Sequence, residues 1–416
     1  MITSFSTALS ALNAYSTAID VVGNNLANLS TPGFKTSVIS FHDLVTQSLG
    51  AGSGETQVGF GVGRPVTFRQ FSQGAIQTTS GPMDAAIQGD GFLVVRTSTG
   101  AQAYTRGGNL QVDLSGMLTT ATGEKLQGWS KTKADGSVDT NTQVGNIVVP
   151  VGTLKAPIPT GNISLDLNLN AAAKVGPPAE TFSTSAEIFD SLGQSHNVTF
   201  TYTKSTTVNQ WNYSITVPDS DLSGPFTPVT GTLVFDSNGK LTTPAATDVS
   251  PSVALTGLAS GATDLTFNWN LYDGTRPRLS QFTQPSAVAA LAQDGSPTAN
   301  LVRVGLGDGG QIFASYSNGQ QLVVGQLAMA TVRNPESMIA IGNSNFQLSA
   351  RSALPAIGLP GSGGRGLVLG GAVEASTVDI AREFTNLIVF QRGYQANSRV
   401  ITTADELSQE TINLKR

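Results

Sequence analysis

Two apolar heptad series run through the first thirty residues and constrain the fold of this chain more than any other feature. The series are Phe5, Leu12, Ile19 and Leu26, and Ala8, Tyr15, Val22 and Leu29. An a/d pattern of this length predicts a helix of about 25 residues, roughly 38 Å long, that packs against another helix. Asp20 is the only charged side chain before Lys35. Because Ser, Thr and Asn take the place of charges on the outer face, we expect that face to be packed as well.

The last forty residues predict a second amphipathic helix, opened by Ser376 with Asp379 three positions later in a capping-box arrangement. Gly393 lies inside this helix and costs about 1 kcal/mol relative to Ala, which is offset if another backbone must approach closely there. The two ends predict either an intramolecular coiled-coil stalk or helices that also pack against other chains. The apolar positions of the second helix are Ile380, Leu387, Tyr394 and Ile401, spaced by seven, and Leu407 on a neighbouring stripe.

Between these ends the apolar period changes to two residues, which predicts half-buried antiparallel strands. The alternating sets are Ile163 to Leu169, Val198 to Tyr202, Trp211 to Val217 and Leu265 to Leu271. Glycine-containing turn signals separate such segments, at Asp90-Gly91, Ser115-Gly116, Thr122-Gly123, Ser191-Leu192-Gly193, Asn238-Gly239 and Asp273-Gly274. The predicted fold class is therefore α+β: paired N- and C-terminal coiled-coil helices plus nested β-rich domains of the antiparallel barrel or sandwich type.

If the terminal helices pair, the β region must be threaded as nested modules, each entered by an early segment and left by a late one. We expect a terminal helical domain (1–36 with 372–416), linkers (37–69 with 356–371), an inner β domain (70–145 with 300–355) and an outer β domain (146–299). Gly, Ser and Pro dominate two stretches of the linkers, which predicts hinges. The hinge glycines are Gly50, Gly52, Gly54, Gly361, Gly363 and Gly364.

Charged residues make up 12% of the 416 residues, against about 25% in ordinary soluble domains. A neutral, hydrogen-bonding surface can be packed against a neighbour without the several kcal/mol that each buried charge costs. The net charge of -5 offers no basic surface to nucleic acid or to anionic lipid. No apolar run approaches the roughly 20 residues that span a bilayer, and the N-terminus lacks the pattern of a Sec signal. We therefore expect no nucleic-acid binding, no membrane insertion and no Sec export.

The patterns that could indicate catalysis, cofactor binding or metal binding are weak. Gly305-x-Gly307-x-x-Gly310 matches a dinucleotide fingerprint, but the residues after it predict a strand where a phosphate cradle needs a helix. We interpret these glycines as a hairpin turn. The chain has no cysteine, its histidines are His42 and His196, and residues 135–139 lack the later Glu of a calcium loop. We expect no catalytic residue, no cofactor and no metal.

Several motifs resemble those of the flagellar rod and hook axial proteins. Two follow the first heptad helix: Asn24-Asn25-Leu26-Ala27-Asn28 and Thr31-Pro32-Gly33-Phe34-Lys35. Residues 371–379, before the last helix, and Gln391-Arg392-Gly393-Tyr394-Gln395-Ala396-Asn397, inside it, are similar to the family's C-terminal motifs. The central pieces are Gln88 to Phe92, Tyr104-Thr105-Arg106 and Leu126 to Trp129. Because these motifs occur in the family's order along the whole chain, the chain is identified as a member of this family.

The resemblance implies a hook-type member, because distal rod proteins lack an outer domain and residues 146–299 supply one here. It implies a structural subunit, not an enzyme, that polymerises into a flexible curved tube, transmits motor torque from rod to filament and encloses the export channel. The implied partners are copies of itself, the distal rod protein, the hook cap, the hook–filament junction proteins and the flagellar type III export apparatus. The implied location is the extracellular hook, attached to the basal body. A distal rod protein and a secreted β-rich adhesin remain the alternatives.

Overall fold

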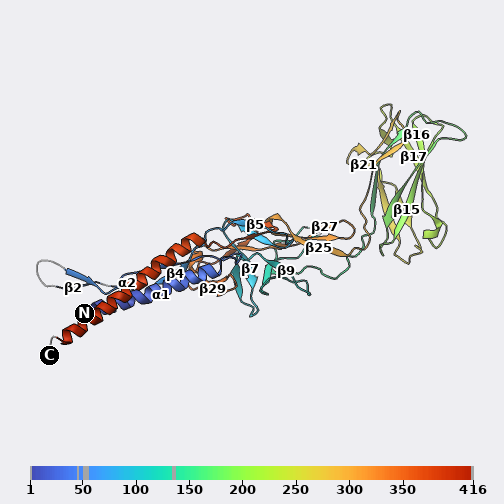
Figure 1. The fold of residues 1–416 in the computed structure, drawn as a ribbon. Helices are drawn as coiled ribbons and strands as arrows, with labels where there is room; N and C mark the ends of the chain where they lie inside the picture. The colour runs from blue at the N-terminus through green and yellow to red at the C-terminus, as the bar shows by residue number, and fades with distance from the viewer. Residues whose placement is uncertain (1, 45, 50–55, 134–136, 414–416) are drawn as a thin grey trace. The chain divides into compact units, whose positions relative to one another are not determined.

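The computed structural model describes residues 2–44, 46–49, 56–133 and 137–413 (Figure 1). The chain divides into two compact units. The inner unit comprises Met1–Val151, Arg303–Ser315 and Gln321–Arg416, and the outer unit comprises Gly152–Val302 and Tyr316–Gln320. The prediction of a β-rich chain with a helix at each end is confirmed.

The two helices, α1 (Ile2–Ala27) and α2 (Ile380–Asn413), lie side by side in the inner unit (Figure 1). The prediction that Ser376 caps α2 is wrong. Asp379 caps it, because its Oδ1 accepts hydrogen bonds from the backbone N–H of Ala381 at 2.9 Å and Arg382 at 3.2 Å. Ser376 lies before the helix and accepts a hydrogen bond from the Val378 N–H at 3.4 Å. The Asp379 carboxylate satisfies two free N–H groups and faces the positive end of the helix dipole, which a serine hydroxyl does less well.

One large sheet makes up most of the inner unit. Its central strands run β27-β11-β7-β8-β30, so segments before and after the outer unit alternate within it. Phe92, Tyr104, Trp129 and Phe346 fill its core. Its strands are β7 (Phe92–Arg96), β8 (Gln102–Thr105), β9 (Leu110–Val112), β10 (Leu118–Thr120), β11 (Lys125–Trp129), β12 (Gly145–Asn146), β25 (Leu301–Leu306), β26 (Gln311–Tyr316), β27 (Gln321–Leu327), β28 (Met329–Thr331), β29 (Ile339–Gly342), β30 (Asn345–Gln347) and β31 (Ala356–Gly358). The 3-10 turns η2 (Asp308–Gly310) and η3 (Pro335–Ser337) connect strands here, and η2 joins β25 to β26 as the predicted hairpin turn.

Four antiparallel strand pairs lie between the helices and the large sheet along the chain. They are β1 (Ser37–Ser40) with β4 (Val66–Arg69), β2 (Thr46–Leu49) with β3 (Thr56–Gly59), β5 (Ile76–Thr78) with β33 (Ala372–Glu374), and β6 (Ala85–Gln88) with β32 (Leu367–Gly370). The stretches expected to be linkers, 37–69 and 356–371, therefore contain strands. Gly and Ser mark their tight turns, while hydrogen bonding to distant segments orders the residues beside them.

The outer unit has two five-stranded sheets that share one hydrophobic core. Every member of the four alternating sets is buried, and the core includes the fully buried Trp211 and Trp269. One sheet has β13 (Asn162–Asn170), β19 (Ser252–Leu255), β20 (Leu265–Asn270), β23 (Leu279–Phe282) and β24 (Ala287–Gln293). The other has β14 (Thr181–Phe189), β15 (Ser195–Lys204), β16 (Gln210–Thr216), β17 (Val229–Phe235) and β18 (Leu241–Thr243), and η1 (Asp219–Asp221) and the pair β21 (Tyr272–Asp273) and β22 (Arg276–Pro277) complete the unit.

Two details of the β region differ from the predictions. The strands are not all antiparallel, because β13 pairs in parallel with β20 and β23. Long connections through the second sheet separate these partners in sequence, which permits parallel pairing. The unit boundary also shifts: residues 146–151 belong to the inner unit, where Ile147 is buried and its N–H donates to the Leu126 carbonyl at 3.2 Å. Residues 300–302 and 316–320 belong to the outer unit. Because β25 crosses this boundary, strand periodicity could not locate it.

Candidate assembly site

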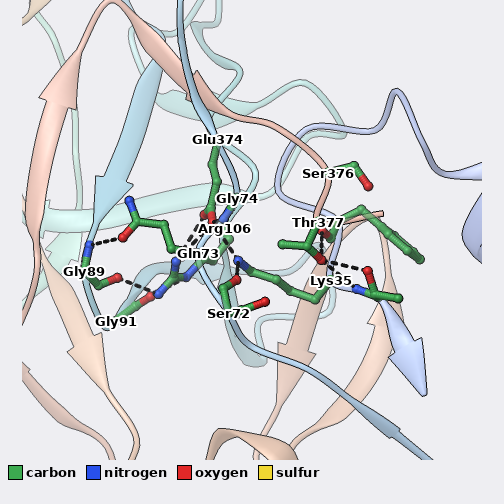
Figure 2. Close-up of polar contacts among 12 residues, drawn as sticks. Lys35, Ser72, Gln73, Gly74, Gly89, Gly91, Arg106, Glu374, Ser376 and Thr377 are labelled. Atoms are coloured by element: carbon green, nitrogen blue, oxygen red, sulfur yellow. Dashed lines mark hydrogen bonds and ion pairs between the residues drawn. The ribbon is translucent and has the colours of Figure 1, made fainter. Parts of the chain in front are cut away.

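A buried cluster of three charged side chains joins segments from the start, the middle and the end of the inner unit (Figure 2). Lys35 and Glu374 are both fully buried, and their Nζ and Oε1 atoms are 2.6 Å apart. The same Nζ donates to the carbonyl of Ser72 at 2.6 Å, and Oε1 accepts from the N–H of Gly74 at 2.7 Å. We call the Lys35, Arg106 and Glu374 side chains the charge cluster.

Arg106 completes the charge cluster from the strand side. Its Nη1 is 3.1 Å from Glu374 Oε2, and its Nε and Nη2 donate to the carbonyls of Gly91 at 2.9 Å and Gly89 at 2.8 Å. The guanidinium also lies over the Phe92 ring, 5.4 Å from its centre. Each polar group is thus bonded, which is the condition for keeping charges in a protein interior.

The backbone around the charge cluster is equally tightly joined. Gly33 donates to the Glu374 carbonyl at 2.8 Å, and the Thr36 N–H donates to Thr377 Oγ1 at 2.9 Å. Gly33 has φ of +71°, and a Cβ there would come 2.5 Å from the Arg106 carbonyl oxygen, so both conformation and space require glycine. The chain leaving α1 and the chain entering α2 are therefore bonded to each other and to the β region.

The charge cluster carries two cations and one carboxylate. Burial, followed by the nearby Arg106, lowers the pKa of Lys35, and Glu374 opposes that shift. Sequence reasoning placed all three residues in motifs but did not bring them together. The available signal was that Lys35, Arg106 and Glu374 are charged side chains inside otherwise uncharged motifs of a chain with few charges. The arrangement has a structural role: it fixes the roots of both helices.

The helices meet along a seam of small residues. On α1 the buried positions are Ala8, Ala11, Ala14, Ala18, Val22 and Asn25. Of the predicted positions, Ala8 and Val22 lie in this seam, whereas Phe5 is 46% exposed and Leu12, Ile19 and Leu26 are half-buried. Tyr15 is half-buried, and Leu29 lies in the turn after the helix. Alanine is buried one position before each of Leu12 and Ile19, because small side chains let two helices approach closely.

On α2, the predicted apolar positions are only partly covered by the rest of the chain. Leu387 and Ile401 are half-buried, whereas Ile380, Tyr394 and Leu407 are exposed. Phe390 and Gly393 face Tyr15 instead, with the Phe390 and Tyr15 ring centres 6.3 Å apart.

Most family-motif residues lie at the helix roots. Asn25 is buried and pairs with the backbone of Ser37, donating from Nδ2 to its carbonyl at 2.9 Å and accepting from its N–H at 3.0 Å. Asn28 Nδ2 donates to the Asn24 carbonyl at 2.9 Å and closes the last turn of α1. The buried Phe34 lies beneath the Arg69 guanidinium. Ala27, Gln391 and Arg392 are exposed, and Asn397 Nδ2 donates to the Gly393 carbonyl at 2.8 Å.

The predicted hinge glycines divide into two groups. Gly361, Gly363 and Gly364 form a turn between β31 and β32, all with φ between +58° and +78°. Gly50, Gly52 and Gly54 lie outside the described residues, as do residues 135 and 136 of the stretch compared with a calcium loop.

His196 is buried in the outer unit between two carboxylates. Its Nδ1 is 3.1 Å from Asp221 Oδ2, and its Nε2 is 3.2 Å from Asp190 Oδ2. The Ser260 hydroxyl donates to Asp190 at 2.7 Å and not to the histidine, so this is no Ser-His-Asp triad. Within the described ranges there is no group of three or more His, Cys, Asp and Glu side chains that could hold a metal. No helix formed by the described residues has the length and apolarity to cross a membrane.

Four family models match the chain. They are Flagella basal body rod protein over residues 5–35, Flagellar hook protein FlgE/F/G D1 domain over 86–165, Flagellar basal body protein FlaE D2 domain over 165–296, and Flagellar basal body rod FlgEFG protein C-terminal over 369–414. The first and last of these models cover the two helices and the charge-cluster residues Lys35 and Glu374.

Full-length relatives agree with these models. Flagellar hook protein FlgE of Salmonella typhimurium is 33% identical over 425 residues, covering 99% of this chain and 100% of that protein. FlgE of Escherichia coli is 32% identical with the same coverage, and FlgE of Borreliella burgdorferi is 30% identical over 100% of both chains. The crystal structure of Helicobacter pylori flagellar hook protein FlgE2 shares the fold, with a TM-score of 0.52 over 70% of this chain and 99% of that one, at 14% identity. The chain belongs to the flagellar hook protein FlgE family and is a structural subunit of the flagellar hook, not an enzyme.

Proposed function

We propose that this chain polymerises through α1 and α2 into the curved tube of the hook. The observation that carries the proposal is the apolar surface that α2 leaves exposed in the single chain. Its exposed large apolar side chains are Ile380, Phe384, Ile388, Val389, Tyr394, Val400, Leu407 and Ile412. They lie on faces other than the seam with α1, and a helix that is apolar on several sides is buried in its functional state.

The predicted interface residues fit this proposal. Phe5, Leu12, Ile19 and Leu26 of α1, and Ile380, Tyr394 and Leu407 of α2, retain surface that a neighbouring copy would cover. Tyr15, Val22, Leu29, Leu387 and Ile401 would pack within the chain as coiled-coil positions. Copies of the chain are therefore the first partner that we propose.

The tube that results would transmit torque from rod to filament, bend as it turns, and enclose an export channel lined by the helices. A surface with few charges supports bending, because neighbouring copies can slide by small distances without breaking buried ion pairs. The charge cluster would hold both helices on the β region while they do so. The proposed hinges at Gly50 to Gly54 and Gly361 to Gly364 would allow small changes of spacing.

The remaining partners belong to the same proposal. They are the distal rod protein at one end, the hook–filament junction proteins at the other, the hook cap during growth, and the flagellar type III apparatus for export without a cleaved Sec signal. The extracellular, basal-body-attached position follows from this route.

Electron microscopy of purified, concentrated protein tests the proposal, with tubes as the expected result. Val400→Asp places a charge on the exposed face of α2 and should abolish tubes while circular dichroism shows an intact monomer. Val249→Asp makes the same change at a valine that is 91% exposed in the outer unit, and should leave the tubes intact. Normal tubes from Val400→Asp, or none from the natural chain, would contradict the proposal.

A further inference from the structure

A cavity of about 470 Å³ lies in the inner unit beside the end of α1. Its wall includes Asn24 and Asn28 of the family motif, Arg69 at the end of β4, Ala121 after β10, and Asn345 at the start of β30. The charge cluster does not line it. Nothing in the assembly surface described above uses this cavity.

Arg69 is the charged residue of the cavity wall, and it has no counter-ion among the described residues. Its guanidinium lies over the rings of Phe34 and Phe346, 5.4 Å and 5.5 Å from their centres. The two rings hold the guanidinium plane but leave its N–H donors without a protein acceptor in the described chain. Burial lowers the pKa of Arg69, as expected for a cation that lacks a nearby anion.

The cavity also presents a free acceptor. Asn345 is 2% exposed, and its Nδ2 donates to Glu124 Oε1 at 2.7 Å. Its Oδ1 is buried and has no hydrogen-bond partner in the structure. The Glu124 carboxylate cannot serve Arg69, since Thr120, Thr122, Asn343 and Asn345 already donate to it. A buried acceptor without a donor costs free energy until a ligand supplies one.

The ligand that satisfies both groups carries a carboxylate for Arg69 and an N–H donor for Asn345. A peptide segment with an acidic side chain has both groups, whereas a small inorganic anion at neutral pH supplies only the first. Carboxylates outnumber basic side chains in this chain, 28 to 23, so copies of it have acidic groups to offer. A guanidinium fork binds a carboxylate with two parallel hydrogen bonds.

We propose that the Arg69 cavity binds an acidic segment of a neighbouring copy, with the carboxylate on the Arg69 guanidinium and a segment N–H on Asn345 Oδ1. This inference rests on the proposed polymerisation and adds a polar contact with a defined place to the apolar contacts of the helices. The contact fixes how far one copy can slide along the next, because the bidentate geometry tolerates little displacement.

The first test compares critical concentrations for assembly. Arg69→Gln should raise the critical concentration about tenfold or more, with an unchanged thermal midpoint of the monomer. Arg69→Lys keeps the charge but loses the fork, and should lie between that variant and the natural chain. Arg96→Gln removes the same charge at an exposed position outside the cavity and should assemble normally. Assembly of Arg69→Gln at the natural concentration would overturn the inference.

The second test does not depend on the stability of an Arg69 variant. Because the chain has no cysteine, Ala121→Cys carries one photoreactive label at the cavity wall, and Leu114→Cys, fully exposed and outside the wall, is the control. Labelled copies are assembled with ¹⁵N copies, and cross-linked peptides are identified by mass spectrometry. Mixed-isotope peptides that contain Asp or Glu are expected from Ala121→Cys alone.

The outcomes separate this inference from the proposed function. Cross-links only within one chain, or binding of acetate to the monomer without any cross-link to a second copy, would overturn the inference while assembly stands. Failure of the natural chain to assemble at all would overturn the proposed polymerisation and this inference with it.

Discussion

The ring of Tyr15 in α1 lies against the backbone of Gly393 in α2, so closely that a Cβ on Gly393 would stand 2.6 Å from Cζ of the ring. The Tyr15 ring also contacts Phe41 and Phe390, with ring centres 5.6 Å and 6.3 Å away. The glycine that sequence reasoning identified as a cost to the helix therefore makes room for an aromatic side chain, and not for another backbone. This contact fixes the height at which α1 and α2 pair.

Replacing Gly393 by Ala tests this relationship through its sign. Helix propensity alone predicts that the change stabilises α2 by about 1 kcal/mol. We expect instead a loss of about 1–3 kcal/mol, because the new methyl group must displace the Tyr15 ring. Thermal unfolding followed by helical circular dichroism measures the difference.

Gly23 provides the matched control for the Gly393 substitution. It lies inside α1, is exposed, and a Cβ there meets nothing within 4 Å. Gly23→Ala should therefore raise the stability of the helix pair by about 1 kcal/mol. If both alanine variants were more stable than the natural chain, the close Tyr15 contact would not hold in solution.

Removing the carboxylate of the charge cluster should weaken the inner unit. Glu374→Gln leaves Lys35 and Arg106 buried without a counter-charge, which costs about 3–5 kcal/mol. Lys35→Met leaves Arg106 and Glu374 as a one-to-one pair and should cost less. Amide-exchange mass spectrometry in increasing urea reports each unit separately, and peptides of the outer unit should be unaffected. An equal loss for both variants would argue against the charge cluster as described.

Two substitutions distinguish assembly from helix pairing in α1. Ala18 is fully buried against the rest of the chain, so Ala18→Asp buries an unpaired charge and should disrupt the helix pair already in the monomer, by several kcal/mol. Leu12 is half-buried, so Leu12→Asp should leave the monomer folded and block tube formation. Amide exchange of the monomer and electron microscopy of the polymer check the two effects. Tubes from Leu12→Asp would remove this residue from the assembly surface.

Acid should destabilise the inner unit through Glu124. Burial raises the pKa of Glu124, but hydrogen bonds from Thr120, Thr122 and Asn343 outweigh it and hold the pKa below the usual 4.5. A carboxyl group with a lowered pKa in the folded state contributes stability above its unfolded pKa and loses it as the pH falls through the folded pKa. In urea unfolding, the difference between the natural chain and Glu124→Gln should therefore shrink as the pH falls from 7 to about 3. A difference that stays constant over this range would contradict the assignment.

Local patterns determined the elements of this protein. Alternation along Leu265 to Leu271 marks a strand with one face in a core, because successive side chains of a strand point to opposite faces. Glycines at the predicted turns adopt positive φ at Gly116, Gly193 and Gly239, a conformation that other residues rarely adopt. Heptads at both ends marked helices that pack on more than one side. These features depend on neighbours within a few residues, so the sequence contains them.

Tertiary structure decided which apolar positions form the helix seam and where the charges meet. Leu12 and Ala11 are both apolar, so periodicity could not tell that the smaller side chain is the buried one; the close approach of α2 decides that. Lys35 and Glu374 are 339 positions apart, and their ion pair forms only because β33 pairs with β5 and brings the last segment back to the first. No local pattern encodes a contact over that distance, because it depends on how the whole inner unit is threaded.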